Sequence, residues 1–186
     1  MSFSFFKRNF LLFLLLTIFS FACNDNPRTA ATTGNFGITA DTVMNYHQNI
    51  SKAEDQQIED FVSRYGWKMT KTPTGLRYLI YHKGSGHKAL KDQVAVCRYS
   101  LKLLNGQEVY RSEKEGMKEF RIGHGGVENG LEEGILLLKV GDRAKFIVPS
   151  HLAFGLLGDQ NRIPPGATLV YDIELVQLKQ NQSKIN

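Results

Sequence analysis

The chain has 186 residues, of which 42% are hydrophobic, and this suits one ordinary globular domain with extensions better than two full domains. Its formal charge of +5 comes from 23 lysines and arginines against 18 acidic residues, and no dense run of basic residues occurs. Nucleic acid is therefore excluded as an expected partner.

Residues 1–22 are typical of an export signal. Lys7 and Arg8 precede an apolar run from Phe10 to Phe21, which is too short for a membrane span of roughly 20 residues. The next residue, Cys23, resembles the acceptor cysteine of a bacterial lipoprotein. We therefore expect a lipid-anchored protein of the cell envelope, held at the outer membrane and facing the periplasm. The alternative is an ordinary cleaved signal with an incidental cysteine.

The segment after this cysteine is expected to separate the anchor from the folded part. Residues 24–35 are small, polar and aperiodic, which predicts a flexible tether, and we expect the lipidated Cys23 and this tether to occupy residues 23–40. The second cysteine, Cys97, lies in a strand pattern among apolar neighbours, so we expect a buried, inert thiol.

Residues 41–67 are expected to form a helical extension. Ser51 and Glu54 match a capping box, which predicts a helix from Lys52 to Tyr65 that ends at Gly66. One apolar stripe follows at helical spacing: Ile58, Phe61, Val62 and Tyr65. We expect this stripe to pack on the main domain, and dimerisation is the alternative.

From residue 68 to residue 180 the pattern predicts an α+β domain. Strands are expected at 76–81, 94–104, 107–111, 120–122, 144–148 and 169–178. Asn105-Gly106 predicts a tight hairpin. Leu131, Ile135 and Leu138 share one face of a short helix that Gly141 is expected to end. We therefore expect a curled antiparallel β-sheet wrapped over one short helix, followed by a tail at 181–186.

Motifs for metal or nucleophilic chemistry are missing from the sequence. It has no CxxC, HExxH, G-x-S-x-G or P-loop pattern, so we expect no metal and no cofactor. The segment 123–126 is glycine-rich but lacks a βαβ frame, and it predicts a tight turn. Glu132 and Glu133 are adjacent on a helix and cannot face one site together. A function that needs only a shaped apolar pocket fits better.

Two stretches carry a resemblance to a known family. "VENGLEEGILLLKVGDRAKFIVPSHLAFG" and "IPPGATLVYDIELVQL" closely resemble the FKBP-type peptidyl-prolyl isomerases, and the likeness runs from about Gly75 to Lys179. The order of lipid cysteine, tether, helix and domain is similar to that of the gliding-motility-associated isomerase-like lipoproteins. The resemblance implies an FKBP-like fold with a pocket between sheet and helix, overhung by a loop that Pro164 and Pro165 stiffen.

The resemblance also implies the site residues. Catalytic positions would be Tyr99, Tyr110, Phe154 and Tyr171, and substrate-binding positions would be Val109, Phe120, Val127, Glu128, Leu131 and Ile163. The usual pattern has tryptophan at 131, Phe-Asp at 109–110 and tyrosine at 154, so two polar anchors of the typical site are absent. Lys118 and Glu128 replace apolar residues, and together with Arg121 they are expected on the solvated surface.

The implied function is peptidyl-prolyl cis-trans isomerisation that assists the folding of exported proteins. Its substrates would be proline-containing peptides or proteins, and it would need no cofactor. The alternative is a catalytically weak or inactive FKBP-like chaperone, or an assembly factor that has a gliding-type surface machine as its partner. A structural lipoprotein with a vestigial fold is a third reading. The sequence leaves the oligomeric state open.

Overall fold

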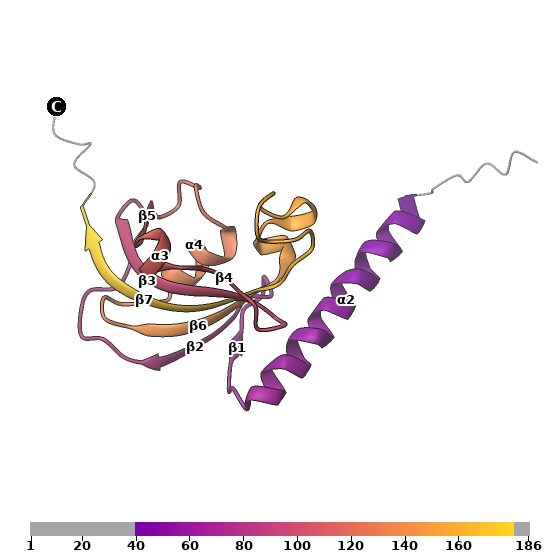
Figure 1. Cartoon of the computed structure of the whole chain (residues 1–186), viewed down its shortest axis with the longest axis horizontal. Helices are drawn as coiled ribbons and strands as arrows, with labels where there is room; N and C mark the ends of the chain where they lie inside the picture. Colours follow the sequence, from indigo (N-terminus) through magenta and orange to yellow (C-terminus); the bar gives the residue numbers. More distant parts are fainter. Residues whose placement is uncertain (1–39, 181–186) are drawn as a thin grey trace, which may run out of the picture. The chain divides into compact units, whose positions relative to one another are not determined.

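A computed structural model describes residues 40–180 of the chain (Figure 1). The expected signal, lipidated Cys23, tether and tail lie outside the described residues. Within residues 40–180, no helix combines the length and apolar character that crossing a bilayer requires.

Helix α2 runs from Ala40 to Tyr65, so the start expected at Lys52 was wrong. Residues 40–50 of this helix include neither glycine nor proline, so nothing in them interrupts the helix. Asp41 lies in the first turn, where its negative charge interacts favourably with the positive end of the helix dipole. The end was predicted correctly, because Gly66 follows the helix with a φ of 64°.

The C-terminal half of α2 packs on the domain through an apolar contact. Ile58 and Phe61 are buried against Ile147 and Val170 of the sheet, which confirms the packing expected for the stripe. Tyr65, the last residue of the stripe, is 54% exposed and stacks on Phe61. Burying these two side chains stabilises the docked helix by about 3–6 kcal/mol, at 1.5–3 kcal/mol each.

Polar contacts fix the same half of α2 in place. Glu54 accepts hydrogen bonds from Ser150 N at 2.7 Å and from the hydroxyl of Thr168 at 2.5 Å, so it does not cap the helix start. The guanidinium of Arg77 is almost fully buried and lies 2.6 Å from Asp55 and 2.7 Å from Glu59. A buried guanidinium needs such partners, so Arg77 ties the sheet to two acidic residues of the helix.

The described part of the domain contains one seven-stranded antiparallel sheet in the order β1-β2-β6-β7-β3-β4, with β5 paired to β3. The strands are β1 (Thr70–Lys71), β2 (Arg77–His82), β3 (Val94–Leu103), β4 (Glu108–Arg111), β5 (Lys118–Arg121), β6 (Arg143–Val148) and β7 (Leu169–Lys179). The hairpin at Asn105-Gly106 is confirmed by the hydrogen bond from Gly106 N to Leu103 O. The α+β class with a curled antiparallel sheet is confirmed (Figure 1).

Short helices fill the connections: α3 (Ser112–Glu115), α4 (Asn129–Ile135) and the 3-10 turns η2 (Ser150–Leu152) and η3 (Gly155–Leu157). Helix α4 lies close to the sheet, because a Cβ on Gly134 would come within 2.5 Å of the Phe146 ring. The helix ends at Ile135, so the end expected at Gly141 was wrong. The chain tightens there through a bond from Leu138 N to Ile135 O, and Leu138 still reaches the core.

Candidate functional site

The residues predicted for the site come together between the inner face of the sheet and α4. One hydrophobic cluster contains every predicted apolar or aromatic position, namely Tyr99, Val109, Tyr110, Phe120, Val127, Leu131, Phe154, Ile163 and Tyr171. Leu131 and Tyr171 are fully buried, whereas Tyr110, Val127 and Phe154 are only partly buried. The last three therefore form the surface that a ligand can reach, and the others support it from beneath.

Strand register places the aromatic side chains of this cluster. Tyr99 on β3 and Tyr171 on β7 both point to the inner face, because side chains alternate along a strand. Their ring centroids lie 6.3 Å apart with the planes tilted by 49°. Phe120 on β5 lies opposite Ala95 of β3 and joins the same face.

A carboxylate is buried within this apolar cluster. The hydroxyl of Tyr171 donates a hydrogen bond of 2.6 Å to Oε1 of Glu128. Nζ of Lys118 lies 3.6 Å from Oε2 of Glu128, and that oxygen has no hydrogen-bond partner among the described residues. The side chain of Glu128 is 1% exposed. Burial and the neighbouring Glu128 charge raise the pKa of Tyr171 well above its ordinary value, so its hydroxyl keeps the proton.

The expectation that Glu128 and Lys118 belong to the solvated surface was wrong. Lys118 lies opposite Cys97 of β3, in an inward-facing register, and its side chain is only 24% exposed. Its Nζ lies 5.4 Å from the centroid of the Tyr99 ring. Arg121 lies at the end of the same strand and stays partly exposed, with Asp92 at 3.0 Å. The sequence contained a signal for Lys118, because it lies two residues from Phe120 and must share its face.

Tyr110 anchors the loop that precedes β7. Its hydroxyl donates to Asp159, whose other oxygen accepts bonds from the backbone N–H of Asn161 at 2.9 Å and of Ile163 at 2.7 Å. The guanidinium of Arg162 lies 4.8 Å from the centroid of the Tyr110 ring. The hydrogen bond to Asp159 raises the pKa of Tyr110 above its ordinary value. Sequence reasoning missed Asp159, although an aspartate after a glycine is a turn signal.

The two prolines lie in the same loop. Pro164 and Pro165, with Ile163 before them, line a groove of about 350 Å³ whose other side includes Leu103 and Gln107. Their rings fix φ on the approach to β7. The predicted overhang therefore lies beside the end of β3.

Cys97 is buried on β3, as expected, and is the free cysteine of the described part of the chain. Burial raises the pKa of its thiol to about 12, so the thiol stays protonated and unreactive at neutral pH. Across residues 40–180, no group of three or more His, Cys, Asp or Glu side chains is placed to hold a metal ion.

The chain is similar to proteins of one family. Residues 86–176 match the model of the FKBP-type peptidyl-prolyl cis-trans isomerases. A probable FKBP-type peptidyl-prolyl cis-trans isomerase FkpA of Neisseria meningitidis is 34% identical over 134 residues, which cover 71% of this chain and 49% of that protein. The chain thus spans about half the length of this relative.

Two solved structures show the same fold. The crystal structure of FkpA from Escherichia coli has a TM-score of 0.61 and 29% identity, and the match covers 74% of this chain and 64% of that one. The crystal structure of AtFKBP13 has a TM-score of 0.57 and 31% identity over 59% of this chain and 98% of that one. The chain therefore belongs to the FKBP-type peptidyl-prolyl cis-trans isomerase family.

Proposed function

We propose that the protein is a peptidyl-prolyl cis-trans isomerase that assists the folding of exported proteins in the cell envelope. The observation that carries the proposal is the continuous apolar cluster between the sheet and α4, in which Tyr99, Phe120 and Leu131 lie beneath the partly exposed Val127 and Phe154. A prolyl ring needs such a surface and no charged partner.

The chemistry follows from the peptide bond itself. Rotation about the bond meets a barrier of about 18–20 kcal/mol, which arises from amide resonance, and at X-Pro bonds exchange takes roughly tens to hundreds of seconds. The twisted amide is less dipolar than either planar form. Apolar side chains at Val127 and Phe154 would therefore stabilise the twisted form relative to the planar forms, and this difference lowers the barrier. The step needs no covalent intermediate.

The polar residues of the site act on its geometry. The Tyr171–Glu128 hydrogen bond fixes the inner wall, and Tyr110 with Asp159 holds the loop that carries Ile163. These residues would keep the surface in one conformation before substrate binds. A preformed surface loses less conformational entropy on binding.

A second candidate is a peptide-binding chaperone or assembly factor with weak turnover, whose partner would be a surface machine of the gliding type. The observation that favours it is that the hydroxyl of Tyr110 already donates a hydrogen bond to Asp159. Phe154 has no hydroxyl that could donate to a ligand. The ligand carbonyl would then lose a hydrogen bond worth about 0.5–1.5 kcal/mol. Binding of prolyl peptides without turnover would identify this case.

Turnover is the test. Exchange NMR on short peptides with different residues before proline measures the acceleration by the full chain. Phe154→Ala should lower the rate about tenfold, which corresponds to losing about 1.4 kcal/mol of apolar contact in the transition state. Leu90→Ala removes a 60% exposed leucine outside the cluster and should leave the rate unchanged. Equal rates for the two variants would contradict the assigned site.

The envelope location is part of the proposal and has its own test. The support is the pattern of Lys7 and Arg8, an apolar run and Cys23. Cys23→Ser should move the protein from the membrane fraction to the soluble fraction and abolish incorporation of labelled palmitate. Retention of Cys23→Ser in the outer membrane would contradict the lipid anchor.

A further inference from the structure

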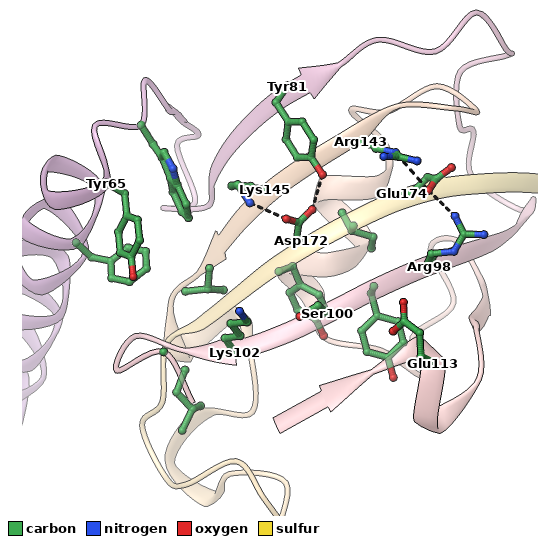
Figure 2. A pocket seen from close by; sticks show the side chains of 18 residues that line it. Tyr65, Tyr81, Arg98, Ser100, Lys102, Glu113, Arg143, Lys145, Asp172 and Glu174 are labelled. Carbon is green, nitrogen blue, oxygen red and sulfur yellow. Dashed lines mark hydrogen bonds and ion pairs between the residues drawn. The ribbon is translucent and has the colours of Figure 1, made fainter. Parts of the chain in front are cut away.

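The outer face of the sheet, opposite α4, carries a groove of about 550 Å³ (Figure 2). Helix α2 covers one end of this face, where Ile58 and Phe61 lie against Ile147 and Val170. Beyond the helix end, the groove continues between Trp67 and Tyr81 on one side and Lys102 on the other. The described part of the chain leaves this stretch of the face uncovered.

At one end of the groove floor, two arginines form ion pairs with the same carboxylate. Arg98 of β3 and Arg143 of β6 both lie opposite Glu174 of β7, so strand register brings the three side chains together. Nη1 of Arg98 and Nε of Arg143 lie 2.7 and 3.4 Å from the same oxygen, Oε2 of Glu174. The arginine side chains are 45% and 52% exposed, and one positive charge remains uncompensated.

The middle of the groove is built around Asp172. It accepts hydrogen bonds from the Tyr81 hydroxyl at 2.5 Å and from Nζ of Lys145 at 2.6 Å. Nζ of Lys145 lies 5.0 Å from the Trp67 ring centroid and 5.2 Å from that of Tyr81, so the cation holds both rings in place. Partial burial and the bond to Asp172 raise the pKa of Tyr81 to about 12, so its hydroxyl stays a donor at neutral pH.

The groove as a whole carries excess positive charge. Four basic side chains line it against three acidic ones, and Glu113 is already paired with Arg111 at 3.1 Å. Lys102 is exposed and forms no ion pair with any of residues 40–180. Next to this charge lies an apolar wall, in which the Phe61 and Trp67 centroids are 5.6 Å apart and those of Tyr65 and Trp67 are 5.0 Å apart.

We propose that this groove binds an extended acidic peptide segment of a partner protein. Its carboxylates would meet Lys102 and the paired Arg98 and Arg143, and its apolar side chains would lie against Tyr65 and Trp67. An extended peptide alternates its side chains, and the groove offers both kinds of contact side by side. The carboxylates on the groove floor would repel a nucleic-acid backbone, because each of its phosphates carries a negative charge. The proposal does not depend on isomerisation, because the groove lies on the opposite face from the candidate site.

Trp67 makes the proposal directly measurable, because it is the one tryptophan of the chain and lines the groove. The full chain is titrated with a blocked six-residue peptide that alternates glutamate and leucine, and Trp67 emission is followed. The expected result is a saturable shift that weakens as salt rises. The same peptide with glutamine in place of glutamate should bind about tenfold more weakly, since each exposed charge pair contributes up to about fivefold.

One charge reversal and one charge neutralisation localise the binding. Lys102→Glu should weaken the glutamate peptide about tenfold, and Arg143→Gln should weaken it about threefold. Lys88→Glu makes the same charge change at an exposed position outside the groove and should have no more than a slight effect. Circular dichroism of each variant checks that the fold is kept. The peptide contains no proline, so the outcome is independent of turnover.

Three kinds of outcome would overturn the proposal. The first is the absence of a saturable emission change. The second is equal affinity for the glutamate and glutamine peptides, or equal effects of Lys102→Glu and Lys88→Glu. The third is binding of a ten-residue thymidine oligonucleotide, or of vesicles with one third anionic lipid, as tight as that of the peptide, because the groove would then be a general polyanion surface.

Discussion

The hydroxyl of Tyr171 on β7 donates a hydrogen bond of 2.6 Å to the carboxylate of Glu128, which precedes α4, and both side chains are almost completely removed from solvent. The pair connects the sheet to the start of the helix across the candidate site. Lys118, at 3.6 Å, supplies the positive charge that a buried carboxylate requires. The inner wall is thus held by a polar triad inside an apolar cluster.

The triad should behave as one unit. Glu128→Ile leaves the Tyr171 hydroxyl buried without an acceptor, which should cost about 1–3 kcal/mol of unfolding free energy. Tyr171→Phe removes the donor and should cost a similar amount. The double variant removes both groups and should lose less than the sum by about 1–2 kcal/mol. Urea unfolding of the four proteins measures this difference, and strictly additive losses would show that the bond contributes nothing.

Tyr110→Phe should loosen the loop before β7. Without the hydroxyl, Asp159 loses its side-chain partner, although it still accepts the Asn161 and Ile163 N–H groups. We expect a loss of about 1 kcal/mol and faster hydrogen exchange of the Ile163 amide. Tyr46→Phe, on an exposed part of α2, is the matched control. Unchanged Ile163 exchange in Tyr110→Phe would exclude this anchoring role.

Docking of α2 should weaken in acid. Hydrogen bonds from Lys71 and Arg77 hold the pKa of Asp55 below its ordinary value of 3.8 in the folded protein. The stabilisation is therefore fully present above pH 3.8 and is lost as pH falls through the lowered folded value. Protection of the Ile58 and Phe61 amides should drop in this range.

Asp55→Asn separates this effect from general acid unfolding. At neutral pH the variant should lose less than about 1 kcal/mol, because Arg77 keeps Glu59 and the Asp55 side chain is partly exposed to screening solvent. The acid-dependent loss of protection at Ile58 and Phe61 should be smaller in the variant than in the parent. If amide protection depended on pH in the same way in the variant and in the parent, Asp55 would not be the group whose protonation weakens docking.

Gly134→Ala should have two opposing effects on stability, a gain in helix propensity and a loss of core packing. Alanine should stabilise α4 by about 1 kcal/mol on propensity alone. A Cβ at this position would lie 2.5 Å from the Phe146 ring, however, and the ring is fully buried in the core. We expect packing to dominate, with a net loss of about 1–3 kcal/mol in thermal or urea unfolding. A more stable variant would show that the ring can move aside.

The elements with local signals could be predicted from the sequence. The alternating run in β3, the Asn105-Gly106 hairpin and the end of α2 at Gly66 each follow from neighbouring residues. The start of α2 could not be predicted in this way. Glu54 matched a capping box three residues after Ser51, but its partners Ser150 and Thr168 lie far along the chain.

The site was predictable in its apolar part and not in its polar part. Family resemblance marked the aromatic positions, and strand alternation explains why they share a face. Glu128 and Lys118 each look like a surface residue when considered alone. Each can be buried only because the opposite charge of the other offsets the cost of removing it from water. The outer groove had no signal either, since its wall comes from the end of α2 and its floor from the strands β3, β6 and β7.

The most direct test of the account is exchange NMR of a short X-Pro peptide with the full chain, with Phe154→Ala and Leu90→Ala measured in parallel. The account predicts acceleration by the parent and by Leu90→Ala, and a rate about tenfold lower for Phe154→Ala with its fold kept by circular dichroism. No acceleration across several residues before proline, with the fold intact by circular dichroism and Trp67 emission, would contradict isomerase activity in this domain.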